Sequence, residues 1–375
     1  MVHLNEHHFT LFLCGDVMTG RGIDQILPYP GDPQLHEQFV RNAMDYVQIT
    51  ELKNGKIDRP VSFQYVWGET LPWLQKIQPD LRFINLETAL TTSNIYDRSK
   101  GIHYRMFPEN VRCLTAAAID GCTLANNHVM DWGRNGLLET RQVLDNAGIG
   151  ITGIGRNETE AKEPVVIPVP HKGRIIAFGA GSLTSGIPPE WAASHDNPGV
   201  YVIDEQNLEC VGDIALRVSS IKKSGDLVLF SVHWGGNWGY SISKNQIHFA
   251  RKLIDDADVD IVHGHSSHHI KGLEVYNKKL ILYGTGDFIN DYEGIGGLKQ
   301  YRPDLVLMYL ATIDGRNGHV IKLELIPLKI RKMKLENASE EDVLWIQSLL
   351  DRECRTERVR FLLSNRNTLE MECDV

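Results

Sequence analysis

Short apolar runs alternate with amphipathic helical stretches over the first two thirds of the chain, a pattern typical of a layered α/β fold. Seven apolar runs are expected to form strands: Thr10–Cys14, Leu81–Ile84, Gly121–Leu124, Arg174–Phe178, Leu227–Val232, Val259–Val262 and Lys279–Tyr283. The stretches Gly136–Ala147 and Lys244–Ala257 carry apolar residues at helical spacing, which predicts two helices. Gly148 after the first and Ser243 before the second are typical of helix ends.

The last part of the chain has a different pattern. The runs Leu305–Thr312 and His319–Leu328 flank a turn rich in Gly, Asp and Asn, which predicts a hairpin. A helix is expected at Glu340–Leu350, followed by a short strand. Residues 20–60 are polar and irregular, which predicts an insertion or a lid. We expect one domain, with residues 1–303 forming the main fold and residues 304–375 completing it.

The charge balance of the amino-acid composition argues against two classes of binding partner. The 375 residues include 39 Lys and Arg against 48 Asp and Glu, a formal net charge of −9. This balance disfavours broad binding to nucleic acid or to anionic membranes, because both need an attractive field. No apolar run approaches the roughly 18 residues of a spanning helix, and the N-terminus lacks a secretory pattern. We expect a cytoplasmic protein with no membrane span, whose six cysteines are reduced.

Polar side chains follow five of the predicted strands. They are Gly15-Asp16, Asn85-Leu86-Glu87, Asn126-Asn127-His128, His233 and the cluster His263–His269. Ligands of open α/β sheets bind beyond the carboxyl ends of the strands, and carboxylate, amide oxygen and imidazole together bind divalent ions such as Mn²⁺, Fe²⁺ or Zn²⁺. Each motif alone is also consistent with a turn or a buried core residue. Four histidines within seven residues favour metal binding or catalysis.

In their joint order these motifs resemble the calcineurin-like metallophosphatase superfamily, and within it the CapA-type family linked to poly-γ-glutamate capsule synthesis. The resemblance extends from about Phe9 to Tyr292. The motifs that carry it are Gly15-Asp16-Val17-Met18, Asn85-Leu86-Glu87-Thr88, Asn126-Asn127-His128 with Asp131, His233-Trp234-Gly235, Gly264-His265-Ser266-Ser267-His268 and Gly284-Thr285-Gly286-Asp287. It implies a four-layer α/β/β/α sandwich with a metal site at the strand ends and a C-terminal extension.

The resemblance also implies roles for single residues. The metal ligands would be Asp16, Glu87, Asn127, His233, His265 and His268, holding one or two divalent ions (Mn, Fe, Zn, Mg or Ca). Glu87 would bridge the two ions, and His128, with Asp131 beside it, matches the catalytic histidine. Met18 stands where the superfamily has a histidine, so the first ion loses one imidazole. The Gly-His-Ser-Ser-His motif leaves open which histidine reaches which ion.

Four further residues are candidates for the substrate side of the site. Arg21 and Arg105 are candidates for binding a carboxylate or phosphate, Trp234 for forming a substrate wall, and Asp287 for orienting a ligand histidine. The alternatives are a solvated cation for each arginine, a core aromatic residue and a solvated acidic turn.

Metal-assisted hydrolysis of an amide, peptide-like or phosphoester substrate is the leading functional hypothesis. A second hypothesis keeps the metal but makes the protein a peptide epimerase that exchanges a Cα proton. A third makes it a non-catalytic accessory of capsule polymer synthesis. The net charge of −9 favours a short peptide-like or small-molecule substrate over an extended polyanion. The sequence does not indicate an oligomeric state.

Overall fold

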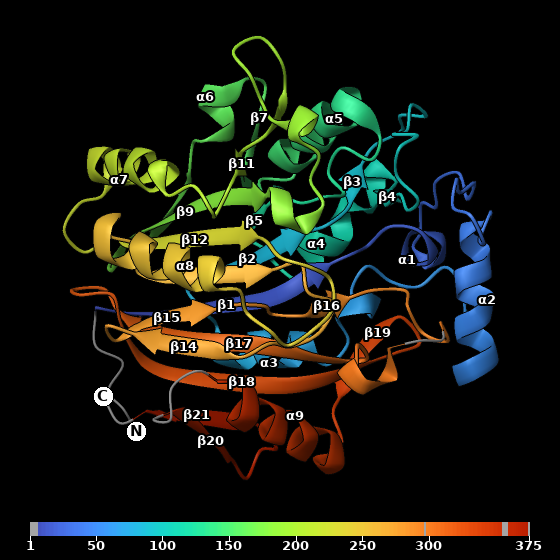
Figure 1. Cartoon of the computed structure of the whole chain (residues 1–375). Coiled ribbons are helices and arrows are strands. Elements are labelled where there is room, and N and C mark those ends of the chain that lie inside the picture. The colour runs from blue at the N-terminus through green and yellow to red at the C-terminus, as the bar shows by residue number, and fades with distance from the viewer. Residues whose placement is uncertain (1–6, 296–297, 355–358, 374–375) are drawn as a thin grey trace.

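Two β-sheets packed face to face form the centre of the fold (Figure 1), in a computed structural model that describes residues 7–295, 298–354 and 359–373. The larger sheet has, in spatial order, β20 (Val359–Leu363), β21 (Leu369–Cys373), β18 (His319–Arg331), β17 (Leu305–Asp314), β1 (His8–Val17), β2 (Leu81–Leu86), β5 (Gly121–Thr123) and β6 (Gly150–Thr152). Two short strands lie beside this path, β16 (Asp287–Ile289) next to β1 and β19 (Lys334–Asn337) next to β18.

The smaller sheet is built from the middle of the chain. Its spatial order is β11 (Val202–Ile203), β9 (Gly173–Ser182), β12 (Leu227–His233), β13 (Ile261–His265), β15 (Lys279–Leu282) and β14 (Leu273–Tyr276), with β8 (Val165–Val169) beside β9. Two small pairs complete the strands: β3 (Ala89–Leu90) with β4 (Arg105–Met106), and β7 (Ile154–Gly155) with β10 (Gly199–Val200). The strands β1, β2, β5 and β6 run parallel, as do β9, β12, β13 and β15, so the carboxyl ends within each set share one edge.

Helices cover the outer faces of both sheets. They are α1 (Gly22–Ile26), α2 (Ala43–Asn54), α3 (Thr70–Ile77), α4 (Arg112–Ala116), α5 (Gly133–Asn146), α6 (Glu158–Ala161), α7 (Glu209–Ile221) and α8 (Lys244–Asp256). Helix α9 (Glu340–Glu353) instead packs its buried apolar side chains into the cluster between the sheets. It lies with β20 and β21 beyond β18, in red at the bottom of Figure 1. No helix of the described ranges is long and apolar enough to cross a membrane.

Alternation along the strands divides the apolar core into three clusters. In β1, Leu11 and Leu13 face the space between the sheets, whereas Phe12 and Cys14 face the helical side. The outer cluster of the larger sheet includes residues of α3, α4 and α5, and that of the smaller sheet includes residues of α7 and α8. The expected four-layer α/β/β/α sandwich is therefore confirmed.

The seven predicted strands are present, and the predicted hairpin is β17 with β18. Residues 20–60 were expected to be irregular, but they contain α1 and α2. Helix α2 was missed because apolar residues lie on both of its faces: Tyr46 and Val47 are buried, while Leu52 is 88% exposed. The tail also has two strands, β20 and β21, where one was expected.

Candidate metal centre

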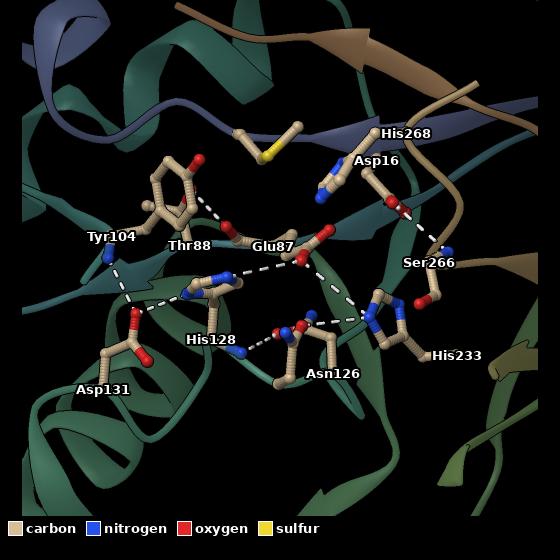
Figure 2. A network of polar contacts seen from close by, with 12 residues as sticks. Asp16, Glu87, Thr88, Tyr104, Asn126, His128, Asp131, His233, Ser266 and His268 are labelled. Atoms are coloured by element: carbon tan, nitrogen blue, oxygen red, sulfur yellow. Dashed lines mark hydrogen bonds and ion pairs between the residues drawn. The ribbon is translucent and has the colours of Figure 1, made fainter. Parts of the chain in front are cut away.

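Strands of both sheets end at one buried site (Figure 2). Asp16 lies near the end of β1 and pairs in register with Asp287, the first residue of β16. His233 and His265 are the last residues of β12 and β13 and lie opposite each other in register. Glu87 follows β2 directly. The parallel arrangement thus brings side chains from distant parts of the sequence to one edge.

Two groups of three potential ligand atoms share Asp16. Asp16, His233 and His265 each offer an atom within 4.8 Å of the other two, and so do Asp16, His268 and Asp287. His233 Nδ1 lies 2.8 Å from His265 Nδ1, and His265 Nδ1 lies 3.7 Å from Asp16 Oδ1. His268 Nδ1 lies 2.8 Å from Asp287 Oδ1. Asp16 is the member that these two groups share, and the bridging role that the resemblance implies for Glu87 stays a prediction.

Glu87 and Asn127 border the first group. Glu87 Oε1 lies 3.8 Å from His233 Nε2 and 3.8 Å from His128 Nε2, on opposite sides (Figure 2). Asn127 Oδ1 lies 3.0 Å from His233 Nε2. Glu87 Oε2 is buried without a hydrogen-bond partner among the described residues, a costly state for a carboxylate oxygen unless a cation satisfies it.

The electrostatics of the site also favour a cation. Burial raises the pKa of Asp16 to about 7, and the carboxylate of Asp287 adds to this effect. Burial and the neighbouring Asp16 raise the pKa of Glu87. Burial lowers the pKa of both His233 and His265, so both rings are neutral, which is the form that binds metal. Clustered buried carboxylates with neutral imidazoles fit a divalent metal ion.

His128 and Asp131 form a hydrogen-bonded pair beside this cluster. His128 Nδ1 donates to Asp131 Oδ2 at 2.6 Å, and the same oxygen accepts from the backbone N–H of Tyr104 at 2.7 Å. Burial lowers the pKa of His128 to about 4. Burial alone would raise the pKa of Asp131, but His128 and Lys100 outweigh it and lower the pKa. Asp131 is therefore ionised and holds a neutral His128 whose Nε2 faces Glu87.

Lys100 completes this pair and was missed by the sequence analysis. Its ammonium group donates to Asp131 Oδ1 and to the backbone oxygen of Asn127, and it lies 5.0 Å from the ring centroid of Trp191. Lys100 belongs to the loop between β3 and β4. An isolated lysine in a loop gives no sequence signal, because its partners come from elsewhere in the chain.

Arg21 does not face the site as a free cation. Its guanidinium is 3% exposed, contacts Asp291 through Nε and Nη2, and donates from Nη1 to Glu37 Oε1 and to the Tyr46 hydroxyl, both at 3.0 Å. It also lies 4.6 Å from the ring centroid of Tyr104. The predicted substrate role does not match this placement, since protein groups engage the donors of Arg21.

Arg105 and Trp234, two more of the substrate candidates, also have protein partners. Arg105 donates from Nη1 to the backbone oxygen of Ser93 at 2.9 Å, and its guanidinium lies 4.0 Å from the ring centroid of Trp132. Trp234 is 1% exposed, belongs to the cluster under α7 and α8, and donates to the backbone oxygen of Tyr283 at 2.9 Å. Trp234 thus packs in the core and does not form a substrate wall.

Aromatic hydroxyl groups border the site on the side where Met18 lies. Met18 is 1% exposed, and its sulfur lies 3.5 Å from the hydroxyl of Tyr292. That hydroxyl lies 2.6 Å from the hydroxyl of Tyr104. The ring of Tyr292 lies edge-on to His268, with 5.6 Å between centroids. The side chain of Met18 is therefore held by an aromatic cluster next to His268.

Comparisons of the sequence with known proteins agree on one family. The model of the bacterial capsule synthesis protein PGA_cap matches residues 10–292. A probable polyglutamine synthesis accessory protein of Mycobacterium tuberculosis is 42% identical over 368 residues, 98% of this chain and 97% of that protein. The capsule biosynthesis protein CapA of Bacillus anthracis is 24% identical over 88% of this chain and 69% of that protein. A solved structure of a novel phosphatase from Mycoplasma pneumoniae covers 88% of this chain and 94% of that chain, at 12% identity and a TM-score of 0.47.

Proposed function

This chain belongs to the bacterial capsule synthesis protein family PGA_cap, and on that premise we propose that it is a metal-dependent hydrolase of the CapA type. Its substrate is an amide, peptide-like or phosphoester compound of polyglutamate or peptide metabolism. One observation carries the proposal: two ligand groups share Asp16, and the His128–Asp131 pair lies beside them. A purely structural metal site has no need of a neighbouring acid–base pair.

The metal supplies Lewis acidity, because a divalent ion polarises a carbonyl or phosphoryl oxygen and makes a water acidic near neutral pH. The ligands we propose are Asp16, His233, His265, His268 and Asp287, with Glu87 and Asn127 bordering them. Their residue types suit Mn²⁺, Fe²⁺ or Zn²⁺.

His128 moves the proton. Its Nδ1 hydrogen is held by Asp131, so a proton enters and leaves at Nε2, the nitrogen that faces Glu87. In the neutral form His128 accepts a proton there, and once protonated it can donate to a leaving group. Lys100 binds the second oxygen of Asp131 and thereby fixes the carboxylate that orients the ring.

The burial of the site bears on the size of the substrate. Asp16 and His265 are fully buried, whereas His128 and His268 are each 7% exposed, so these two histidines lie nearest to solvent. This burial favours a small molecule or a single linear chain over a folded protein as the substrate.

Activity on a substrate panel tests the proposal. Purified protein, freed of metal and reloaded with Mn²⁺, Fe²⁺ or Zn²⁺, is offered phosphoesters, peptides and poly-γ-glutamate. Metal-dependent hydrolysis of any of them supports the proposal. Exchange of a Cα proton in deuterated water without bond cleavage would support a peptide epimerase instead. The name of the mycobacterial relative favours an accessory role, and polymer binding without any reaction would support that role.

Two variants separate catalysis from metal binding. His128→Ala removes the acid–base group but no proposed ligand, so turnover should fall by about 10²–10⁴ while metal content stays near normal. Glu87→Ala removes a carboxylate of the centre, so metal content and turnover should fall together. The exposed His195 provides a matched control, since His195→Ala should change neither quantity. Equal metal loss in His128→Ala and Glu87→Ala would make His128 a ligand.

A further inference from the structure

One buried histidine next to the proposed metal centre has no role in the proposed function. His263 is fully buried on β13, two residues before His265. Its Nε2 lies 2.8 Å from the backbone oxygen of Cys14, and its Nδ1 lies 3.1 Å from Ser231 Oγ. The same Oγ lies 3.0 Å from His265 Nε2. A continuous chain of polar contacts therefore runs from the backbone of β1, through β13 and β12, to a proposed ligand.

The direction of every hydrogen in this chain follows from its first member. A backbone oxygen can only accept, so Nε2 of His263 carries a hydrogen. His263 contacts no carboxylate among the described residues and is neutral in its buried position, so its Nδ1 is an acceptor. The single hydrogen of the Ser231 hydroxyl then goes to His263 Nδ1. Toward His265 the hydroxyl oxygen must accept, which places a hydrogen on His265 Nε2.

The backbone oxygen of Cys14 is available because the ladders on both sides of β1 skip this residue. The pairing with β17 ends at Leu13, and the pairing with β2 jumps from Leu13 to Asp16. This irregularity leaves the oxygen of Cys14 for His263. It also directly precedes the shared ligand Asp16, so the start of the hydrogen-bond chain and the metal centre are fixed to the same short segment.

We propose that His263 and Ser231 are positioning residues that hold His265 as its Nε2–H tautomer, so that the bare Nδ1 faces the metal. This inference rests on the proposed metal centre. Nδ1 of His265 is the atom that lies beside His233 Nδ1 and Asp16 Oδ1. With the opposite tautomer, a hydrogen would occupy the direction of the metal. Hydrogen bonds of this kind to the far nitrogen of a ligand histidine raise metal affinity.

Nuclear magnetic resonance of the metal-free protein reads the tautomer directly. With ¹⁵N-labelled histidine, and His265 assigned by comparison with His265→Gln, we expect a protonated Nε2 and an unprotonated Nδ1 at His265. His263 should show the same pattern. A protonated Nδ1 at His265 would overturn the proposal. This measurement needs neither bound metal nor activity.

Affinity for Co²⁺, measured by competition with a chelator, tests whether the hydrogen bonds of Ser231 and His263 raise metal affinity. Ser231→Ala and His263→Leu should each weaken binding by about 10–100-fold. His263→Gln keeps one donor and one acceptor, so it should bind within about 3-fold of the wild type. Ser182→Ala is the matched control, because Ser182 is an equally buried serine that donates to Glu205 and, among the described residues, forms no side-chain hydrogen bond with His263 or His265.

The tautomer measurement and the Co²⁺ affinity measurement together separate this inference from the proposed function. Wild-type affinity in both Ser231→Ala and His263→Leu, with folding verified by circular dichroism, would overturn the positioning role. If either variant fails to fold, the tautomer in the wild-type protein decides. If the wild type binds none of the offered Co²⁺, Mn²⁺, Fe²⁺ or Zn²⁺, the proposed metal centre fails while the tautomer result still stands.

Discussion

Replacing Arg21 by methionine should destabilise the protein strongly. The change leaves two buried carboxylates, Glu37 and Asp291, without their cation. Removing one partner of a buried ion pair costs about 3–5 kcal/mol. The guanidinium also lies 4.0 Å from the ring centroid of Tyr46, and a desolvated cation–π contact contributes about 1–2 kcal/mol. We expect the free energy of unfolding to fall by about 4–7 kcal/mol, from the sum of these two effects.

Urea unfolding followed by tryptophan fluorescence measures this change. Arg156→Met is the matched control, because Arg156 is 68% exposed in its pair with Glu160, and an exposed pair contributes less than about 1 kcal/mol. The double variant Arg21→Met with Asp291→Asn also removes one of the two carboxylates that Arg21→Met leaves unpaired. Its loss of stability should therefore be smaller than the sum of the losses in the two single variants. A loss below about 1 kcal/mol in Arg21→Met would refute the claim that Arg21 compensates two buried carboxylates. It would also restore the substrate-binding hypothesis for Arg21.

Four further measurements test other parts of the structure. Mn²⁺ at about 100 times its dissociation constant should stabilise the wild type by about 2.7 kcal/mol in thermal unfolding, and Asp16→Asn much less; equal stabilisation would place the ion elsewhere. Lys100→Met should retain metal content but lower turnover at least about 10-fold, because the carboxylate that orients His128 loses a partner; unchanged turnover would exclude this positioning. Burial of Asp342 opposes its ionisation, but Arg302 and Lys329 prevail and lower its pKa from 3.8 to about 2, so its ionised form stabilises the fold above about pH 4. Asp342→Asn should therefore cost about 2 kcal/mol at pH 6, and urea unfolding should show the difference narrowing as the pH falls toward 2; a difference independent of pH would contradict this. Thiol titration of the denatured, unreduced protein should count close to six groups, since all five cysteines with described side chains are free; two or fewer would indicate disulfides.

The strands of the sandwich could be predicted because their burial is continuous. β12 and β13 are buried at every position, and the runs Leu227–Val232 and Val259–Val262 carry that burial as apolar sequence interrupted only by Ser231 and Asp260. The residues that follow such runs then fall at one edge of a sheet, which is why polar motifs in the sequence indicated a site. Helix α2 gave no comparable signal, because Leu52 places an apolar side chain in solvent.

Pairings between distant segments could not be read from the sequence. The charge of Arg21 is compensated by Asp291, which lies 270 residues later in the sequence. Lys100 contacts Asp131 from a loop. The shared position of Asp16 depends on side-chain geometry, since Asp287 enters through the register of β1 with β16. A sequence motif indicates which residue types stand at the strand ends. Only the distances between their side-chain atoms show which carboxylate belongs to both ligand groups.

The ligand groups take their members from both sheets, with Asp16 and Asp287 from the larger and His233 and His265 from the smaller. The proposed centre is therefore assembled only when the two sheets have docked, and an ion bound there would hold them together across their apolar interface. Unfolding of the loaded protein would then first require release of the ion, because the sheets could not separate while it is bound. Loading would lengthen the lifetime of the native state more than it hastens its formation. Resistance to proteolysis should accordingly follow the rate at which a chelator extracts the metal.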